Sequence, residues 1–188
     1  MSVGPNAPLN DSCSIFQAGS AVSAVNAWTS AGFPADQIIL GVPAYGHGYH
    51  VDPADALDAL GNLRVNPPFD RNQQPHGDSQ DGEAGEDQCG NPVPPGGLFN
   101  FWGMIDEGYL SDNGSVVERV DYVFDECSLT PYVYDPSSEV LVSFDDAESF
   151  RLKGEFISNT GLAGFSMWHV LGDHEDILLD AITEGMSR

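Results

Sequence analysis

The chain has 188 residues, enough to bury one hydrophobic core, and its hydrophobic content of 41% does not predict disorder. It carries 29 acidic and 6 basic residues, a formal net charge of −23 at pH 7. A field of this sign repels phosphate backbones and anionic lipids, which excludes nucleic acid and membrane surfaces as partners. No apolar run approaches the roughly 20 residues of a membrane span, and no signal peptide follows Met1.

The first 51 residues predict a loop, a helix and a buried strand. Residues 1–19 are rich in Pro, Asn, Ser and Gly and predict a loop. Ser20 is the predicted N-cap of a helix whose apolar residues recur at helical spacing until Trp28, and Gly32 ends the pattern. Residues 38–42 form a short apolar, β-branched run, which is typical of a strand buried in a parallel sheet.

The middle of the chain, residues 52–143, has a different character. Residues 61–97 are rich in Pro, Gly, Asn, Gln and Asp and predict a long irregular stretch, which in compact domains is usually functional or disordered. A short helix is predicted after Phe101. Short antiparallel strands separated by turns are predicted at 120–124, 131–134 and 140–142.

The C-terminal part repeats the helix-then-strand order. A helix is predicted over 146–160 with Gly161 at its end, then a buried strand over 162–168, then a final helix that starts at Gly172 and Asp173. The whole pattern predicts an α/β fold with an inserted α+β subdomain. The predicted segments are 1–51, 52–143 and 144–188.

Candidate site residues follow the two predicted buried strands. Tyr45 and His47 come just after the first strand, and their spacing puts both on one side of an extended chain. Trp168 ends the second strand. Aromatic rings pack on the C–H faces of sugars, while Tyr and His tips hydrogen-bond hydroxyls. The alternative is a structural Tyr and His at a rim and a Trp that closes a core.

The three cysteines form no metal-binding motif, and Cys89 and Cys127 lie in polar, turn-rich surroundings that suit a disulfide in a secreted protein. Cys13 is then the unpaired thiol, with a partner expected upstream, and three reduced thiols are the alternative. We predict no metal site, because two histidines three residues apart on an extended segment, His47 and His50, are poor ligand geometry. The acidic stretch 78–87 lacks the spacing of an EF-hand.

Six segments in register resemble the C-terminal half of fungal-type chitinases of glycoside hydrolase family 18. They cover nearly the whole chain and read GVPAYGH, FWGMIDEGYL, CSLTPYVYD, VLVSFDDAESF, GLAGFSMW and DILLDAI. The resemblance implies the C-terminal part of a TIM (β/α)8 barrel, with the α+β subdomain inserted between strands seven and eight, and no cofactor. It implies that Trp168 is the floor of a sugar subsite, that Tyr45 and His47 line the groove and that Tyr132 lies in the groove wall. It also implies an extracellular protein.

Two departures from the family pattern concern the chemistry. The family signature D-x-x-D-x-D-x-E, whose Glu protonates the glycosidic oxygen, is absent. Its nearest approach is Asp78, Asp81 and Glu83, followed by Gly85 where the Glu must be, in a polar loop that we interpret as solvated surface. His169 also follows the tryptophan where the family usually has Glu. We therefore predict no catalytic residue in this chain.

Three hypotheses remain open at this stage. The chain is part of a chitinase whose upstream half carries the acid, a non-catalytic module that binds chitin or N-acetylglucosamine oligosaccharides, or an interaction protein that pairs with itself. About half of a barrel cannot close and leaves strand edges and apolar surface exposed. Self-association or a missing N-terminal barrel half is therefore predicted.

Overall fold

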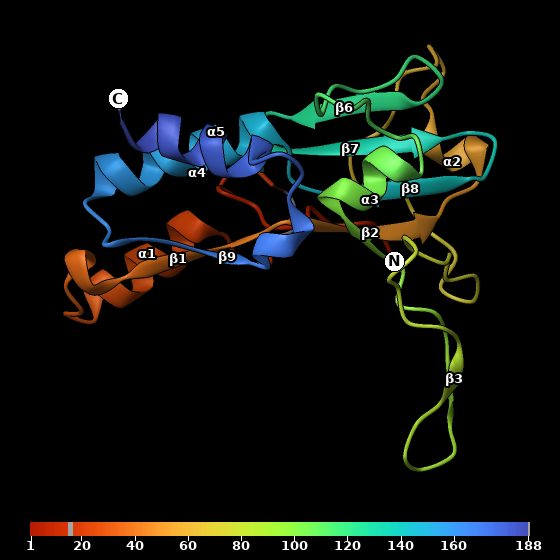
Figure 1. Cartoon of the computed structure of the whole chain (residues 1–188), viewed down its shortest axis with the longest axis horizontal. Coiled ribbons are helices and arrows are strands. Elements are labelled where there is room, and N and C mark those ends of the chain that lie inside the picture. Colours follow the sequence, from red (N-terminus) through yellow and green to blue (C-terminus); the bar gives the residue numbers. More distant parts are fainter. Residues whose placement is uncertain (15–16, 188) are drawn as a thin grey trace.

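The computed structural model describes residues 1–14 and 17–187 and contains two parts, a pair of parallel strands and a five-stranded antiparallel sheet (Figure 1). The parallel pair is β1 (Ile39–Pro43) and β9 (Gly164–Trp168), in register from Ile39 beside Gly164 to Pro43 beside Trp168. Three longer helices accompany these strands, namely α1 (Ala21–Ser30), α4 (Ala147–Thr160) and α5 (Ile177–Met186). No helix among the described residues is long and apolar enough to cross a membrane.

The predicted N-cap of α1 and the predicted glycine at the end of α4 are both present, and α4 also has an N-cap that was not predicted. Ser20 and Ser23 form a capping box at the start of α1, and Asp146 and Ser149 form another at the start of α4. Gly161 ends α4 in the left-handed conformation that favours glycine. The final helix starts later than predicted, because residues 170–172 form a short 3-10 turn, η2 (Val170–Gly172), before α5.

The antiparallel sheet has the strand order β5-β2-β8-β7-β6. Its strands are β2 (Tyr45–His50), β5 (Leu98–Asn100), β6 (Asp121–Asp125), β7 (Thr130–Asp135) and β8 (Val140–Ser143). The last three confirm the predicted strands. Only Ala44 separates β1 from β2, so one nearly continuous extended segment joins the two parts (Figure 1). Residues 45–50 thus lie in the antiparallel sheet, although the predicted division placed them in the segment 1–51.

The antiparallel sheet separates two hydrophobic cores. Side chains alternate between its faces, so Val133 and Val142 join a core with α3 (Phe101–Asp106), α4 and α5. Tyr132, Tyr134 and Leu141 face a smaller core that the N-terminal segment and α2 (Pro53–Ala56) help to close. All six residues of β7 are buried.

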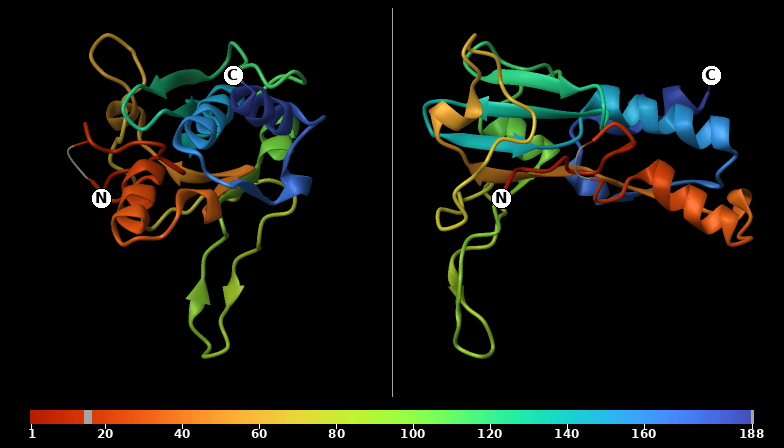
Figure 2. Two further views of the ribbon diagram at one scale, coloured as in Figure 1. Left: turned by 90° about the vertical axis from the view of Figure 1, so that its left-hand side faces the viewer. Right: turned by 180° about the vertical axis from the view of Figure 1, so that it is seen from behind.

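Helices α4 and α5 lie side by side (Figure 2) because glycines let their backbones approach closely. A Cβ atom on Gly154 would lie 2.2 Å from the carbonyl oxygen of Ile182, and one on Gly185 would lie 2.1 Å from that of Arg151. Both distances are too short for any side chain.

The predicted irregular stretch contains a small hairpin that projects from the body (Figures 1 and 2). Its strands are β3 (Gly85–Glu86) and β4 (Pro92–Val93). The interpretation of Asp78 as solvated surface is wrong: Asp78 is 1% exposed, and its carboxylate accepts hydrogen bonds from the backbone and side-chain nitrogens of Asn100. Asp81 accepts from the backbone N–H groups of Gly77 and Gly97 and fastens the base of the same loop.

The burial predicted for the two parallel strands is also wrong in part. Ile39 is 61% exposed and Trp168 is 73% exposed. In the described part of the chain, β1 and β9 have only each other as strand neighbours. Parallel strands are normally buried between further strands and helices, so this pair leaves its outer edges and part of its apolar surface uncovered.

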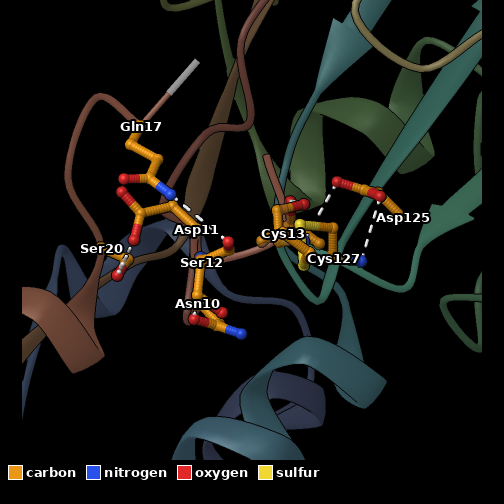
Figure 3. The surroundings of a disulfide bond; sticks show 10 residues. Asn10, Asp11, Ser12, Cys13, Gln17, Ser20, Asp125 and Cys127 are labelled. Carbon is orange, nitrogen blue, oxygen red and sulfur yellow. Dashed lines mark hydrogen bonds between the residues drawn. A yellow bond between two sulfur atoms is a disulfide. The ribbon is translucent and has the colours of Figure 1, made fainter. Parts of the chain in front are cut away.

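The predicted disulfide between Cys89 and Cys127 is wrong. The bond joins Cys13 to Cys127, 114 residues apart along the chain (Figure 3). Cys89 is a free, exposed thiol between β3 and β4 of the projecting hairpin. The N-terminal segment reaches Cys127 because the backbone N–H of Leu9 donates to the carbonyl of Ser128, 2.8 Å away. The amino-acid composition around each cysteine could not predict that Cys13 and Cys127 lie close together in the folded chain.

We expect the double variant Cys13→Ser/Cys127→Ser to lose about 2–4 kcal/mol of unfolding free energy, because the bond restricts a long loop in the unfolded chain. Urea denaturation measures the loss. Cys89→Ser is the matched control and should leave the midpoint unchanged. Equal midpoints for the double variant and the control would contradict a stabilising role of this disulfide.

Candidate functional site

A cavity of about 320 Å³ lies at the carboxyl ends of β1 and β9. It brings together three of the four residues predicted to bind a ligand: Tyr45, His47 and Trp168. The rest of its lining comes from the ends of the strands and from the N-terminal segment, namely Asn6, Ala7, Gly41, Val42 and Pro43. The carboxyl ends of parallel strands are where α/β proteins hold their ligands.

Tyr132, the fourth predicted residue, does not line this cavity. It is completely buried in the smaller core, where its hydroxyl donates to Asn66 Oδ1 at 3.1 Å. Burial also raises the pKa of its phenol. Side chains alternate along β7, and this alternation turns Tyr132 toward the smaller core. It is therefore a core residue.

Trp168 is open to solvent at the rim of the cavity. The backbone of β9 holds it beside Pro43, and the carbonyl of Trp168 accepts from the N–H of Ala44 at 2.9 Å. An indole that is 73% exposed on a fixed strand end adds little to the core and offers a flat apolar face to a ligand.

Tyr45 and His47 point to the same side of β2, as their spacing predicted. Their rings meet edge to face, with centroids 5.5 Å apart. Burial lowers the pKa of the His47 imidazole and so favours its neutral form. The ring Nδ1 lies 3.0 Å from Oδ1 of Asn6, a residue that the sequence analysis did not single out.

Asn6 connects the cavity to a buried ion pair. Its Nδ2 donates to the carbonyl of Tyr45 at 2.7 Å and to Asp145 Oδ2 at 3.2 Å. Asp145 is 2% exposed and pairs through Oδ1 with the ammonium of Lys153, the only lysine of the sequence. Ser149 donates to the same carboxylate at 2.9 Å. Burial raises the pKa of the Asp145 carboxyl, while Lys153 favours its ionised form.

His169 belongs to a separate polar chain behind Trp168. Its Nε2 lies 3.1 Å from Oδ1 of Asn100, and Asn100 Nδ2 donates to the buried Asp78 at 2.9 Å. The histidine that stands where the family usually has Glu is thus bonded within the protein. No sequence signal identified Asn6 or Asn100, because both lie in segments whose composition predicts only loop or strand end.

The cavity supplies aromatic and hydrogen-bonding groups but no acid. Among its described lining residues none carries a carboxyl group, and the nearby Asp145 is committed to Lys153. The described residues hold no cluster of three His, Cys, Asp or Glu side chains with metal-binding geometry. His50 lies three residues from His47 on the strand and faces Glu139, with 3.3 Å between Nε2 and Oε2.

These features define an α/β protein with a cavity lined by aromatic and polar side chains at the carboxyl ends of its parallel strands. The family is established by sequence comparison. The model of glycosyl hydrolases family 18 matches residues 1–173, and the chain belongs to this family.

Three similar proteins illustrate the relationship. A "chitinase-like effector" of Moniliophthora roreri is 54% identical over 187 residues, which cover 97% of this chain and 46% of that protein. The crystal structure of a chitinase from Rhizomucor miehei superposes with a TM-score of 0.81 at 32% identity and covers 98% of this chain and 49% of that one. A chitinase from Cycas revoluta, solved with (GlcNAc)4, shares the fold at 20% identity, with a TM-score of 0.68, 98% of this chain and 42% of that one covered. This chain thus spans less than half of each of these relatives.

We expect Lys153→Met to lower the free energy of unfolding by about 3–5 kcal/mol, because it leaves the buried Asp145 carboxylate without an opposite charge. Denaturant unfolding measures the loss. Arg151→Met on the same helix removes the partly exposed pairs with Glu148 and Glu155 and should cost less than about 1 kcal/mol. Similar losses of unfolding free energy in the two variants would show that the buried pair stabilises the fold no more than the pairs of Arg151.

Proposed function

We propose that this chain binds oligosaccharides of β-1,4-linked N-acetylglucosamine and does not hydrolyse them by itself. The observation that carries the proposal is the cavity at the ends of β1 and β9, which joins Trp168, Tyr45 and His47 and contains no carboxyl group among its described lining residues. The barrel placement of the two parts, with β1 as strand seven, β9 as strand eight and the antiparallel sheet as the insertion between them, belongs to the same proposal.

The chemistry of the cavity suits a neutral sugar. The exposed indole of Trp168 offers a flat face for the C–H groups of a pyranose ring, and the phenol of Tyr45 and the imidazole of His47 offer hydrogen bonds to hydroxyl and acetamido groups. A net charge of −23 disfavours anionic ligands and leaves an uncharged oligosaccharide unaffected.

Hydrolysis needs a proton donor for the glycosidic oxygen, and this chain offers none at the cavity. The signature D-x-x-D-x-D-x-E is absent from the sequence. Asp145, the carboxylate nearest to the cavity in the hydrogen-bond network, is buried and paired with Lys153. Asp78 is buried and bonded to Asn100, so it is no substitute for the missing acid.

The relative named "chitinase-like effector" in Moniliophthora roreri, 54% identical to this chain, supports a ligand of the chitin type. The alternative is that the chain acts as part of a chitinase whose other half supplies the acid, which the 49% coverage of the Rhizomucor chitinase favours. We also propose an extracellular location, supported by the disulfide between Cys13 and Cys127, since disulfides persist in oxidising compartments.

Trp168→Ala should weaken binding of (GlcNAc)4 about tenfold or more, a loss of about 1.4 kcal/mol or more, because it removes the stacking face. Isothermal titration calorimetry measures the affinity, and the exposed position of Trp168 keeps the fold intact. The matched control is Trp28→Ala, which removes a 60% exposed Trp on α1 that contacts Phe33 rather than the cavity. Equal affinity in both variants would contradict a sugar subsite on Trp168.

The unaltered chain should release no product from a fluorogenic N-acetylglucosamine oligomer. Turnover by the purified chain would overturn the non-catalytic part of the proposal. Turnover that appears only when a separately produced barrel half is added would favour the alternative, a chitinase in two parts.

We expect the purified chain to associate with itself, because α1, β1, η2 and the loop after α1 expose large apolar side chains. They are Trp28 (60%), Phe33 (42%), Ile39 (61%), Val170 (68%) and Leu171 (81%). Light scattering after size-exclusion chromatography should give a mass above that of the single 20.1 kDa chain, and Ile39→Glu should lower it. A strict monomer that binds no apolar dye would contradict this expectation.

A further inference from the structure

Asn6 has only one possible amide orientation in its hydrogen-bond network. The atom 2.7 Å from the carbonyl oxygen of Tyr45 must be the amide nitrogen, because a carbonyl only accepts. The same nitrogen also faces Asp145 Oδ2. The other terminal atom of Asn6 is therefore the amide oxygen, which only accepts.

This orientation determines the tautomer of His47. The amide oxygen of Asn6 lies 3.0 Å from His47 Nδ1, so Nδ1 must carry the hydrogen of that bond. In the neutral ring Nε2 then keeps a free lone pair. His47 lines the cavity, and its Nδ1 edge is occupied by Asn6, which leaves the Nε2 edge for a ligand.

We propose that Asn6 is a positioning residue that holds His47 in the Nδ1–H form, so that Nε2 accepts a hydrogen bond from a hydroxyl or amide N–H of a bound N-acetylglucosamine residue. The assignment of the sugar rests on the proposed function; the assignment of the tautomer rests on the hydrogen bonds of Asn6 alone. The cavity therefore selects for ligands that place a donor at His47.

The rigidity of Asn6 has a structural source. Its two nitrogen contacts reach β2 and the segment between β8 and α4, where Asp145 is itself fixed by Lys153 and Ser149. An amide with three fixed partners loses little further freedom when a ligand arrives. The conformational entropy needed to fix the His47 ring is thus lost during folding rather than during binding.

Long-range proton–nitrogen correlation spectra of protein labelled with ¹⁵N-histidine test the tautomer at pH 7.5 without any sugar. The expected result for His47 is a protonated, pyrrole-type Nδ1 and an unprotonated, pyridine-type Nε2. Asn6→Ala should convert this pattern to a mixture of tautomers, whereas the control Asn10→Ala, in the same segment but outside this cavity, should not change it. The reverse pattern in the unaltered protein, or an unchanged pattern in Asn6→Ala, would overturn the role of Asn6.

Calorimetry with (GlcNAc)4 tests the acceptor. His47→Phe keeps a ring beside Tyr45 but removes both ring nitrogens. Asn6→Ala keeps both nitrogens of His47 but no longer fixes which of them carries the hydrogen. Each should weaken binding about three- to tenfold, the size of one hydrogen bond, while Asn10→Ala binds like the unaltered protein. If Asn6→Ala does not fold, the spectrum of the unaltered protein and the affinity of His47→Phe still decide the question.

The outcomes separate this inference from the proposed function. Undetectable binding by the unaltered protein overturns the oligosaccharide proposal and the sugar contact, while the spectra still decide the tautomer. Binding that is unchanged in His47→Phe but lost in Trp168→Ala overturns the acceptor role and leaves the oligosaccharide proposal standing.

Discussion

The buried ion pair between Asp145 and Lys153 is the interaction on which the arrangement of the cavity depends. It joins Asp145, just before α4, to Lys153 in the middle of that helix. The same carboxylate accepts a hydrogen bond from Asn6, which also contacts His47 and the carbonyl of Tyr45. A charge pair at this depth costs desolvation and is tolerated because each partner and its hydrogen bonds satisfy the other. The N-terminal segment and the antiparallel sheet therefore meet at one network.

The two parts of the chain differ in how completely they bury their apolar surface. Both faces of the antiparallel sheet are covered. Helices α3, α4 and α5 pack on one face, and the N-terminal segment packs on the other. The parallel pair has helices but no further strand neighbours in the described residues, and Ile39 is exposed. The stability of the chain thus resides mainly in the sheet and in the close contact of α4 with α5, while the cavity lined by Tyr45, His47 and Trp168 lies at the boundary between the parts.

Ligand binding and acid catalysis are separable in a glycosidase site because different side chains perform them. In the binding that we propose, stacking and hydrogen bonding come from Trp168, Tyr45 and His47, whereas cleavage needs a carboxylic acid beside the glycosidic oxygen. A protein that keeps the first set and lacks the second is expected to hold a sugar without reacting with it. The two polar chains behind the cavity, from Asn6 to Asp145 and from His169 to Asp78, use their carboxylates for structure.

The sequence alone predicted α1, α3, α4 and α5, five of the strands and the family, because capping residues, periodicity and six motifs in register are local or ordered signals. It also placed Tyr45, His47 and Trp168 at strand ends. Only the tertiary structure decided the partner of Cys127, the burial of Tyr132 and Asp78, and the role of Asn6, since each depends on segments that are far apart in the chain. Composition describes the neighbourhood of a residue along the chain, whereas disulfides, buried carboxylates and tautomers are set by neighbours in space.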